Sequence, residues 1–487
     1  MRYLKTISLI IIVAFFISCT DNDIFSLSPN NKLKFSVDTV KLDTTFSNVP
    51  TPTKKFWVYN YSGSGIKINK ISLSQGNQTG YRVNIDGISL NQSNGWQVKD
   101  IELKNKDSIR IFVELTSSET GEKKPILITD NLIFKLESGT EQKVNLKAFS
   151  WDAILTDNIV EIDKDSLIQN NKPIVINKGI NIKEGTTLTI EKGTTIYFAN
   201  KAGIDVHGKL IIKGEKDNEV TLRGNRLDKM FDYLPYNNVS GQWKGIHFYK
   251  TSYGNNLNFM DLHSAYNGIE IDSSNIDKEK LIINNSTVHN CQGFGIKSTS
   301  AYITINNSLL SNSQKPCIFI IGGKVFLNQC TIAQFYPFEG GEGNALSFGT
   351  KSGKWVNKLV LLKIRNSIVT GYADDVISLY FDDKTVQNYL FDHCLIRANK
   401  PKDNDKLSKY ISTVWEDLTD TIHSGKKNFK LVDIEKQRYN FQLNKNSLAI
   451  DKGAVLPDNI SKIDRIGRKR TEKPDLGCYE YFETNNK

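Results

Sequence analysis

The sequence predicts an all-β chain whose largest part is a solenoid of stacked coils, preceded by a β-sandwich. The first sign is a repeat: residues 281–286, 303–308 and 325–330 share one pattern of apolar, amide and small residues, and they start 22 positions apart. The second sign is a change near residue 155 from period-two alternation to short apolar triplets parted by tight turns. A period of about 20–30 residues with β-rich runs is typical of solenoids.

Residues 31–150 alternate polar and apolar side chains over short runs, as in residues 55–59 and 108–113. Runs of period two that are parted by Gly, Asn and Ser indicate an antiparallel β-sandwich. Residues 56–60, followed by residues 65–68, resemble Ig-like modules of bacterial envelope proteins, and this resemblance implies a spacer. No paired carboxylates or histidine cluster in this region suggest chemistry.

From residue 155 the expected strands have three to five residues, for example residues 179–182, 187–190 and 195–198. This pattern predicts a right-handed parallel β-helix, in which Ile, Val and Leu stack inside and coils lie about 4.8 Å apart. Residues 182–223 and 241–248 resemble the opening coils of the pectate-lyase-like β-helix superfamily. The resemblance implies the fold over residues 155–425, whereas the usual catalytic motifs of that superfamily are not recognisable.

The end of the chain has its own pattern at residues 446–453, 464–468 and 474–480. These segments resemble the terminal module of the choice-of-anchor type that follows many bacterial β-helices. Because a solenoid must cover its last open coil, we interpret the module as a β-rich cap. Three of its aspartates are expected to form turns and to pair with arginine: Asp451, Asp464 and Asp475.

The first 18 residues have the pattern of a secretory signal, with a basic start and an apolar run at residues 9–17. That run is about half as long as a membrane-spanning helix needs. Residues 16–19 resemble a bacterial lipobox, which implies lipidation of Cys19 and attachment to a membrane. Alternatively, this is a plain signal peptide with an incidental cysteine.

Residues 20–23 resemble the acidic surface-export signal of Bacteroidetes lipoproteins, which implies an outer-membrane lipoprotein exposed on the cell surface. The predicted organisation has five parts: a signal peptide at 1–18, a tether at 19–30, an Ig-like β-sandwich at 31–150, a right-handed parallel β-helix at 155–425 and a C-terminal capping module at 426–487.

The charge and the cysteines exclude some classes of function. A net charge of +10, from 63 basic and 53 acidic residues, permits attraction to acidic glycans. It does not require nucleic acid, and no nucleic-acid motif occurs. Besides Cys19, five cysteines remain, an odd number without a Cys-x-x-Cys spacing, so neither a disulfide framework nor a zinc site is expected. Cys330 and Cys394 occupy positions where sister repeats carry serine, so they are expected to be buried.

No nucleophile elbow, phosphate loop, zinc-binding histidine pair or EF-hand loop occurs, and the six histidines are scattered. Function is therefore expected where coils stack. If residues 246, 269, 296, 318, 346 and 377 point inwards, the residue after each points outwards. This outward row comprises His247, Glu270, Lys297, Phe319, Ser347 and Ser378. The next outward row comprises Tyr249, Asp272, Thr299, Ile321, Gly349 and Tyr380. The row at the strand entry borders a turn, which leaves its direction open, and it comprises Lys244, Asn267, Phe294, Pro316, Asn344 and Asp375.

Basic and acidic side chains of three neighbouring coils thus share one face. β-Helix polysaccharide lyases neutralise a uronate carboxylate with Lys, Arg or calcium and remove the adjacent proton with a base. Here Lys244 or Lys297 would pair with the uronate, and His247 or Tyr249 would be the base.

Glu270 and Asp272 would bind a cation on the same face, and two carboxylates are also what a glycoside hydrolase needs. The motifs show no cofactor, and they leave the metal open, with calcium as a candidate. In the alternative interpretation, these charges form cross-strand pairs that stabilise an exposed sheet.

Non-catalytic glycan binding on this face is the leading hypothesis, with Phe294, Phe319 and Tyr380 as stacking platforms. The chain is then a lipid-anchored envelope protein that binds polysaccharide. The alternatives are a polysaccharide lyase or glycoside hydrolase acting on acidic glycans, and an adhesin or structural surface protein. The repeated amides, such as Asn284 and Asn306, are expected to be structural, because stacked amides satisfy one another's hydrogen bonds.

Overall fold

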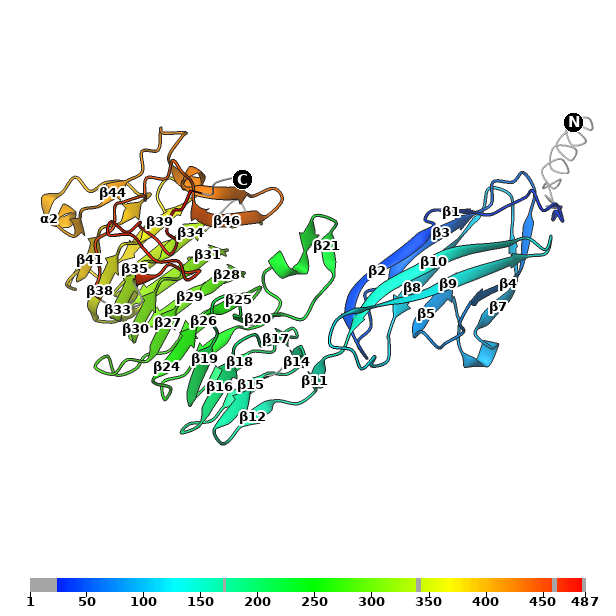
Figure 1. Ribbon diagram of the computed structural model, residues 1–487, viewed down its shortest axis with the longest axis horizontal. Helices are drawn as coiled ribbons and strands as arrows, with labels where there is room; N and C mark the ends of the chain where they lie inside the picture. The colour runs from blue at the N-terminus through cyan, green and yellow to red at the C-terminus, as the bar shows by residue number, and fades with distance from the viewer. Residues whose placement is uncertain (1–23, 170–171, 339–342, 458–461, 484–487) are drawn as a thin grey trace, which may run out of the picture. The chain divides into compact units, whose positions relative to one another are not determined.

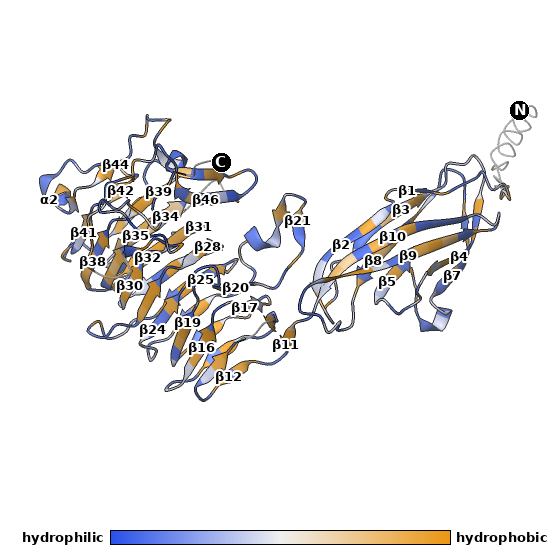
Figure 2. Ribbon diagram, viewed as in Figure 1, coloured by the Kyte–Doolittle hydropathy of each residue, from blue (hydrophilic) through white to orange (hydrophobic). Residues whose placement is uncertain are grey.

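The computed structural model describes residues 24–169, 172–338, 343–457 and 462–483, and it divides the chain into two compact units, residues 1–152 and 153–487. The regular secondary structure of both units consists almost wholly of strands (Figure 1). Along the strands, hydrophobic residues alternate with hydrophilic ones (Figure 2), which is the pattern that half-buried strands need. Among the described residues, no helix has the length and apolar composition that crossing a membrane requires.

The first unit is a β-sandwich of two five-stranded sheets. One sheet has the order β1 (Lys34–Phe35), β3 (Lys54–Tyr59), β8 (Ser108–Leu115), β5 (Tyr81–Ile85) and β6 (Ile88–Ser89). The other has the order β2 (Thr39–Phe46), β10 (Glu141–Trp151), β9 (Ile126–Leu136), β4 (Ile66–Leu73) and β7 (Gln97–Leu103). A 3-10 turn, η1, occupies Gln92–Asn94.

The core of the sandwich consists of the inward side chains of both sheets, such as Val58, Ile111 and Phe134. Pairing is antiparallel as predicted, with one exception: β2 and β10 pair in parallel. The exception arises because these two strands lie at opposite ends of the unit's sequence and are not joined by a hairpin, which would require antiparallel pairing.

The second unit is the right-handed parallel β-helix that the sequence predicts, with three long parallel sheets. The nine-stranded sheet comprises β12 (Val160–Ile162), β15 (Ile180–Ile182), β18 (Ile204–Val206), β23 (Ile246–Phe248), β26 (Ile269–Ile271), β29 (Ile296–Thr299), β32 (Ile318–Ile321), β35 (Leu346–Gly349) and β40 (Ile377–Tyr380). The ten-stranded sheet comprises β13 (Ser166–Ile168), β16 (Thr187–Glu191), β19 (Lys209–Lys213), β24 (Asn255–Asn258), β27 (Leu281–Asn284), β30 (Tyr302–Asn306), β33 (Gly323–Asn328), β38 (Leu359–Arg365), β41 (Tyr389–Asp392) and β43 (Tyr410–Ile411).

The third, eleven-stranded sheet comprises β11 (Ile154–Thr156), β14 (Ile174–Ile176), β17 (Thr195–Phe198), β20 (Val220–Gly224), β25 (Met260–His263), β28 (Thr287–Cys291), β31 (Leu309–Ser313), β34 (Thr331–Gln334), β39 (Ile368–Gly371), β42 (Leu395–Ile396) and β44 (Val414–Trp415). The remaining elements are short: β21 (Lys229–Phe231), β22 (Leu234–Pro235), η2 (Tyr236–Asn238), β36 (Lys351–Ser352), β37 (Trp355–Val356), α2 (Asn404–Leu407), η3 (Gly425–Asn428), β45 (Phe429–Asp433) and β46 (Arg438–Leu443).

The 22-residue repeat forms consecutive strands of the ten-stranded sheet. Leu281 pairs with Ile303, and Ile303 pairs with Val325, so equivalent residues stack directly on one another. All three side chains are fully buried, and burying such a side chain stabilises the fold by about 1.5–3 kcal/mol. The repeat is therefore a stack of apolar rungs.

Rows of hydrogen-bonded asparagine side chains, here called amide ladders, run beside the apolar rungs near the end of each repeat. Asn306 Nδ2 donates to Asn284 Oδ1 at 2.9 Å, and Asn328 Nδ2 donates to Asn306 Oδ1 at 2.8 Å. In a second ladder, Asn307 Nδ2 donates to Asn285 Oδ1 at 2.7 Å. Asn285 and Asn307 have φ values of 49° and 51°, in the left-handed region that asparagine tolerates better than most residues. The structural role predicted for the amides is confirmed, as is the burial of Cys330 and Cys394.

The C-terminal segment packs along the outward face of the eleven-stranded sheet. Its residues Phe429, Phe441 and Leu476 share one apolar cluster with Leu309 and Ile368 of the sheet. At the last coil, Asn428 Nδ2 donates to Glu416 Oε1 at 2.9 Å, so the segment contacts that coil and also runs back along the flank.

Ion pairs fix the fold of this segment. Arg468 lies 2.7 Å from Asp464, and the buried Arg470 lies 3.0 Å from Glu480. The carboxylate of Asp475 accepts the backbone N–H of Asp451 at 2.7 Å. The pairing expected for Asp464 is therefore present.

Residues 400–427 are rich in charged side chains, yet they complete the solenoid. They supply β43 and β44, which extend two sheets by one strand each. Tyr410 of β43 stacks on Phe391 at 4.9 Å and lies 5.1 Å from Trp415 of β44, measured between ring centroids. Aromatic rings thus fill the end of the solenoid core.

Adjacent isoleucines on β27 provide a test of this packing. Ile283 is fully buried, whereas Ile282 points outwards and is partly exposed. Ile283→Ala should lower the free energy of unfolding by about 2–5 kcal/mol, because it leaves a cavity in the stack. Ile282→Ala should change it by less than about 1 kcal/mol. Urea unfolding followed by circular dichroism measures both, and equal losses would contradict the inward position of Ile283.

Candidate functional site

The predicted outward row lies on the nine-stranded sheet in continuous register. His247 pairs with Glu270, Glu270 with Lys297, and Lys297 with Phe319. These four side chains are partly exposed, but Ser347, two coils beyond Lys297, is fully buried. The register of the row is as predicted, and its accessible members are His247 to Phe319 and, beyond the buried Ser347, Ser378.

Two ion pairs connect neighbouring coils on this face. His247 Nε2 lies 3.1 Å from Asp272 Oδ1, and Lys297 Nζ lies 3.2 Å from Glu270 Oε1. All four side chains are between 30% and 39% exposed, so each pair contributes only about 0.2–1 kcal/mol to stability. The pairs match the cross-strand interpretation, yet they are weak enough to exchange for a ligand.

Tyr249 lies at the centre of the polar end of this face. Its ring centroid is 4.0 Å from that of His207 and 4.0 Å from that of His247. Its hydroxyl donates to Asp205 Oδ1 at 3.3 Å. Burial raises the pKa of the Tyr249 hydroxyl, and the nearby carboxylates of Asp205, Asp272 and Glu270 raise it further.

A raised pKa keeps Tyr249 protonated near neutral pH. Tyr249 is therefore suited to donate a hydrogen bond and poorly suited to act as a base. Of the two bases that the sequence predicts, His247 fits the role better, since an imidazole nitrogen can accept a proton and the ring is held beside a carboxylate through its Nε2.

A hollow of about 420 Å³ opens at the same place. Four of the predicted residues line it: Lys244, His247, Tyr249 and Glu270. The other residues that line it are Asn200, Lys201, Gly203, Asp205, Gly241, Trp243, Gly245, Ile246, Tyr266 and Asn267. The exposed Lys244 and the partly exposed Asn267 belong to the entry row, so this row faces the hollow and not the core.

Glycines allow the coils to approach each other below the hollow. Gly245 has a φ of 97°, and a Cβ there would collide with the carbonyl oxygen of Asn267. Only glycine fits this turn, so the backbone itself forms part of the wall. Asp272 and Lys297 lie outside the lining, where they pair with His247 and Glu270.

The three predicted platforms form one aromatic strip, which consists of Phe294, Phe319 and Tyr380. The ring centroids of Phe294 and Phe319 are 5.1 Å apart, and those of Phe319 and Tyr380 are 6.0 Å apart. Lys297 Nζ and Lys315 Nζ lie over the Phe294 ring at 5.8 and 5.4 Å. Tyr380 is 45% exposed. The strip continues the polar hollow along the same sheet.

Asp205 is a residue of this site that the sequence analysis missed. It pairs in register with His247, one coil before the first coil that was aligned. An excursion between β20 and β23, which contains β21, β22 and η2, lengthens this coil and hides the neighbour. Aligning the apolar triplet of β18 with that of β23 would have revealed it, because Ile204 pairs with Ile246.

A group of possible metal ligands lies on a different sheet from the one predicted. Within the described ranges, the one group of three or more close ligand atoms consists of Asp261, His263 and His289 of the eleven-stranded sheet. Glu270 and Asp272 do not form such a group, and the roles predicted for the outward rows remain predictions. Cys19 lies outside the described residues.

Comparisons with known proteins concern the fold. A search of curated proteins finds no match. Among solved structures, the chain is similar to pectate lyase Pel9A, at 15% identity over 68% of this chain and 88% of that chain with a TM-score of 0.28. It is also similar to the catalytic unit of the GH87 α-1,3-glucanase from Streptomyces thermodiastaticus strain HF3-3, at 9% identity over 70% and 74% of the two chains with a TM-score of 0.28.

A PapD-like domain of human CEP192 is similar at 10% identity over 28% of this chain and 96% of that chain, with a TM-score of 0.18. Residues 157–334 match the family model described as "Right handed beta helix region". This match confirms the fold class that the sequence predicts for these coils.

Proposed function

We propose that the outward face of the nine-stranded sheet binds an acidic polysaccharide. The observation that carries the proposal is the continuity of two surfaces. The hollow beside His247 and Tyr249 adjoins the Glu270–Lys297 pair, and Lys297 also lies over the first ring of the aromatic strip. An extended ligand lying across the coils meets polar groups first and aromatic rings next.

Each part of this face suits one part of a sugar. The apolar faces of sugar rings stack on aromatic side chains such as Phe319 and Tyr380. Carboxylates such as Asp205 accept hydrogen bonds from hydroxyl groups, and the Tyr249 hydroxyl can donate one. Lys244, exposed at the rim, and the weakly paired Lys297 offer positive charge to uronate or sulfate groups.

A second candidate function is cleavage of the bound glycan by a lyase or hydrolase. The observation that favours it is the place of His247 in the wall of the hollow, beside Asp272 at 3.1 Å and on the same wall as Lys244. An imidazole held by a carboxylate is a suitable general base, and a nearby ammonium stabilises a developing enolate.

Matched aromatic substitutions test the binding proposal. Phe319→Ala and Tyr380→Ala should each weaken binding of an acidic polysaccharide about tenfold, which corresponds to about 1.4 kcal/mol for one lost stacking contact. Phe326→Ala is the control, because Phe326 is also partly exposed and lies 5.7 Å from a lysine, Lys324, but belongs to the ten-stranded sheet. Affinity electrophoresis against a panel of uronate and sulfate polysaccharides measures the change.

Unchanged affinity in Phe319→Ala and Tyr380→Ala, or an equal loss in Phe326→Ala, would exclude the aromatic strip as the binding surface. The same incubations are followed for absorbance of unsaturated uronate and for new reducing ends. Product that disappears in His247→Ala supports cleavage, whereas binding without product from any polysaccharide of the panel leaves binding as the function.

We further propose that a lipid on Cys19 attaches the chain to the outer membrane, with the solenoid outside the cell. The support is the lipobox-like sequence at residues 16–19 and the acidic segment that follows it. Such an anchor would hold the glycan-binding face close to the cell surface.

Metabolic labelling with a fatty acid tests the anchor. The full chain should incorporate label and sediment with membranes, whereas Cys19→Ala should lose the label and become extractable without detergent. Cys317→Ala is the control, because Cys317 is fully buried and not available for acylation. Label that persists in Cys19→Ala would disprove this anchor, and resistance of the chain to protease added to intact cells would disprove surface exposure.

A further inference from the structure

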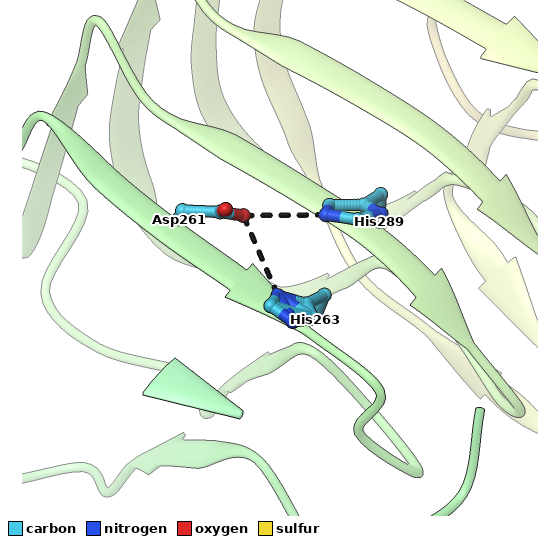
Figure 3. A group of neighbouring side chains, drawn as sticks. All are labelled: Asp261, His263 and His289. Carbon is cyan, nitrogen blue, oxygen red and sulfur yellow. Dashed lines mark ion pairs between the residues drawn. The ribbon is translucent and has the colours of Figure 1, made fainter. Parts of the chain in front are cut away.

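Asp261, His263 and His289 come together on two adjacent strands of the eleven-stranded sheet. Asp261 and His263 belong to β25, and His289 belongs to β28, where it pairs in register with His263. Figure 3 shows a carboxylate oxygen of Asp261 facing a nitrogen of each of the two imidazoles. This group lies on a different sheet from the hollow and the aromatic strip.

The distances in this group fit a small cation. Asp261 Oδ1 lies 3.2 Å from His289 Nε2 and 3.6 Å from His263 Nδ1, and all three ligand atoms lie within 4.8 Å of one another. In a tetrahedral zinc site with bonds of about 2.0–2.1 Å, neighbouring ligand atoms are about 3.4 Å apart. The two distances from Asp261 lie on either side of this value.

The hydrogen bonding of His263 is the second, independent observation. Its Nε2 lies 2.8 Å from Asn237 Oδ1, which can only accept, so Nε2 carries the proton. A neutral ring then has a lone pair on Nδ1, and this atom faces the carboxylate oxygen of Asp261. The His263 side chain is only 3% exposed, and Nδ1 has no hydrogen-bond partner among the described residues.

A buried lone pair that faces a carboxylate oxygen is unfavourable unless a proton or a metal cation lies between them. The contact between Nε2 of His263 and Asn237 is also what metal sites use to orient a histidine ligand. Three observations therefore indicate the same position for a cation: Asn237 orients His263, Nδ1 of His263 is unpartnered, and the distances fit tetrahedral ligands.

We infer that Asp261, His263 and His289 bind one zinc ion. Two imidazoles and one carboxylate are a ligand set that zinc prefers, whereas calcium takes six to eight oxygen ligands. Asp261 and His289 are 29% and 23% exposed, so the group lies near the surface of the sheet. The ion ties β25 to β28 and leaves one position for water or a ligand.

The surrounding charges set a limit on affinity. The guanidinium groups of Arg223 and Arg465 lie within electrostatic reach of Asp261 and oppose a further cation. Glu219 offsets one of them, because its carboxylate lies 2.7 Å from Arg465. We therefore expect a site that binds zinc reversibly and that a strong chelator can empty.

Metal titration of the full chain tests the inference. Protein stripped with a chelator should bind one equivalent of Zn²⁺ in competition with a chromogenic chelator, and it should not bind Ca²⁺ at the same place. Co²⁺ should give the intense visible absorption of a tetrahedral site. His289→Ala and Asp261→Asn should each lower zinc affinity at least tenfold, and both residues are exposed enough for the fold to tolerate the change.

His423→Ala is the matched control, because His423 pairs with Asp420 at 2.8 Å but has no third ligand beside it in the described part of the chain. It should bind zinc as the unaltered chain does. The inference fails if the stripped chain binds no zinc, if His289→Ala and Asp261→Asn bind it with unchanged affinity, or if Co²⁺ binds with octahedral absorption only.

Discussion

The parallel register between neighbouring coils is the constraint on which the rest of the structure depends. Inward isoleucines such as Ile246, Ile269 and Ile296 pair with one another and are fully buried. A shift of one residue in any coil would bring a charged side chain such as Glu270 into the core and expose an isoleucine. Burial of the apolar stack therefore also determines which polar side chains meet outside.

Both proposed binding regions follow from this register. It places His247 beside Asp272 and Lys297 beside Glu270, although the members of each pair are more than 20 positions apart in the sequence. On the eleven-stranded sheet, the same stacking brings His289 to Asp261. The residues at the repeated positions stabilise the fold through apolar rungs and amide ladders. The positions that differ between coils are free to carry binding groups.

Much of the stacking between coils was predictable from the sequence, because aligning the repeated segments shows which residues pair in neighbouring coils. The outward row from His247 to Phe319 and the amide ladder at Asn306 follow from aligning the triplets. Asp205 did not follow, since the excursion between β20 and β23 lengthens the coil that separates it from His247. The histidines look scattered along the sequence. His263 and His289 become neighbours only because β25 pairs with β28 in the eleven-stranded sheet.

Hydroxyl-radical footprinting of side chains, with and without bound acidic polysaccharide, tests most directly whether the nine-stranded sheet is the binding face. Oxidation of Tyr249, Phe319 and Tyr380 should fall on binding, because a ligand across the coils covers the hollow and the aromatic strip. Tyr302 and Phe326, a pair of rings on the ten-stranded sheet, should react unchanged. Protection of Tyr302 and Phe326 with continued oxidation of Phe319 and Tyr380 would contradict the assignment of this face.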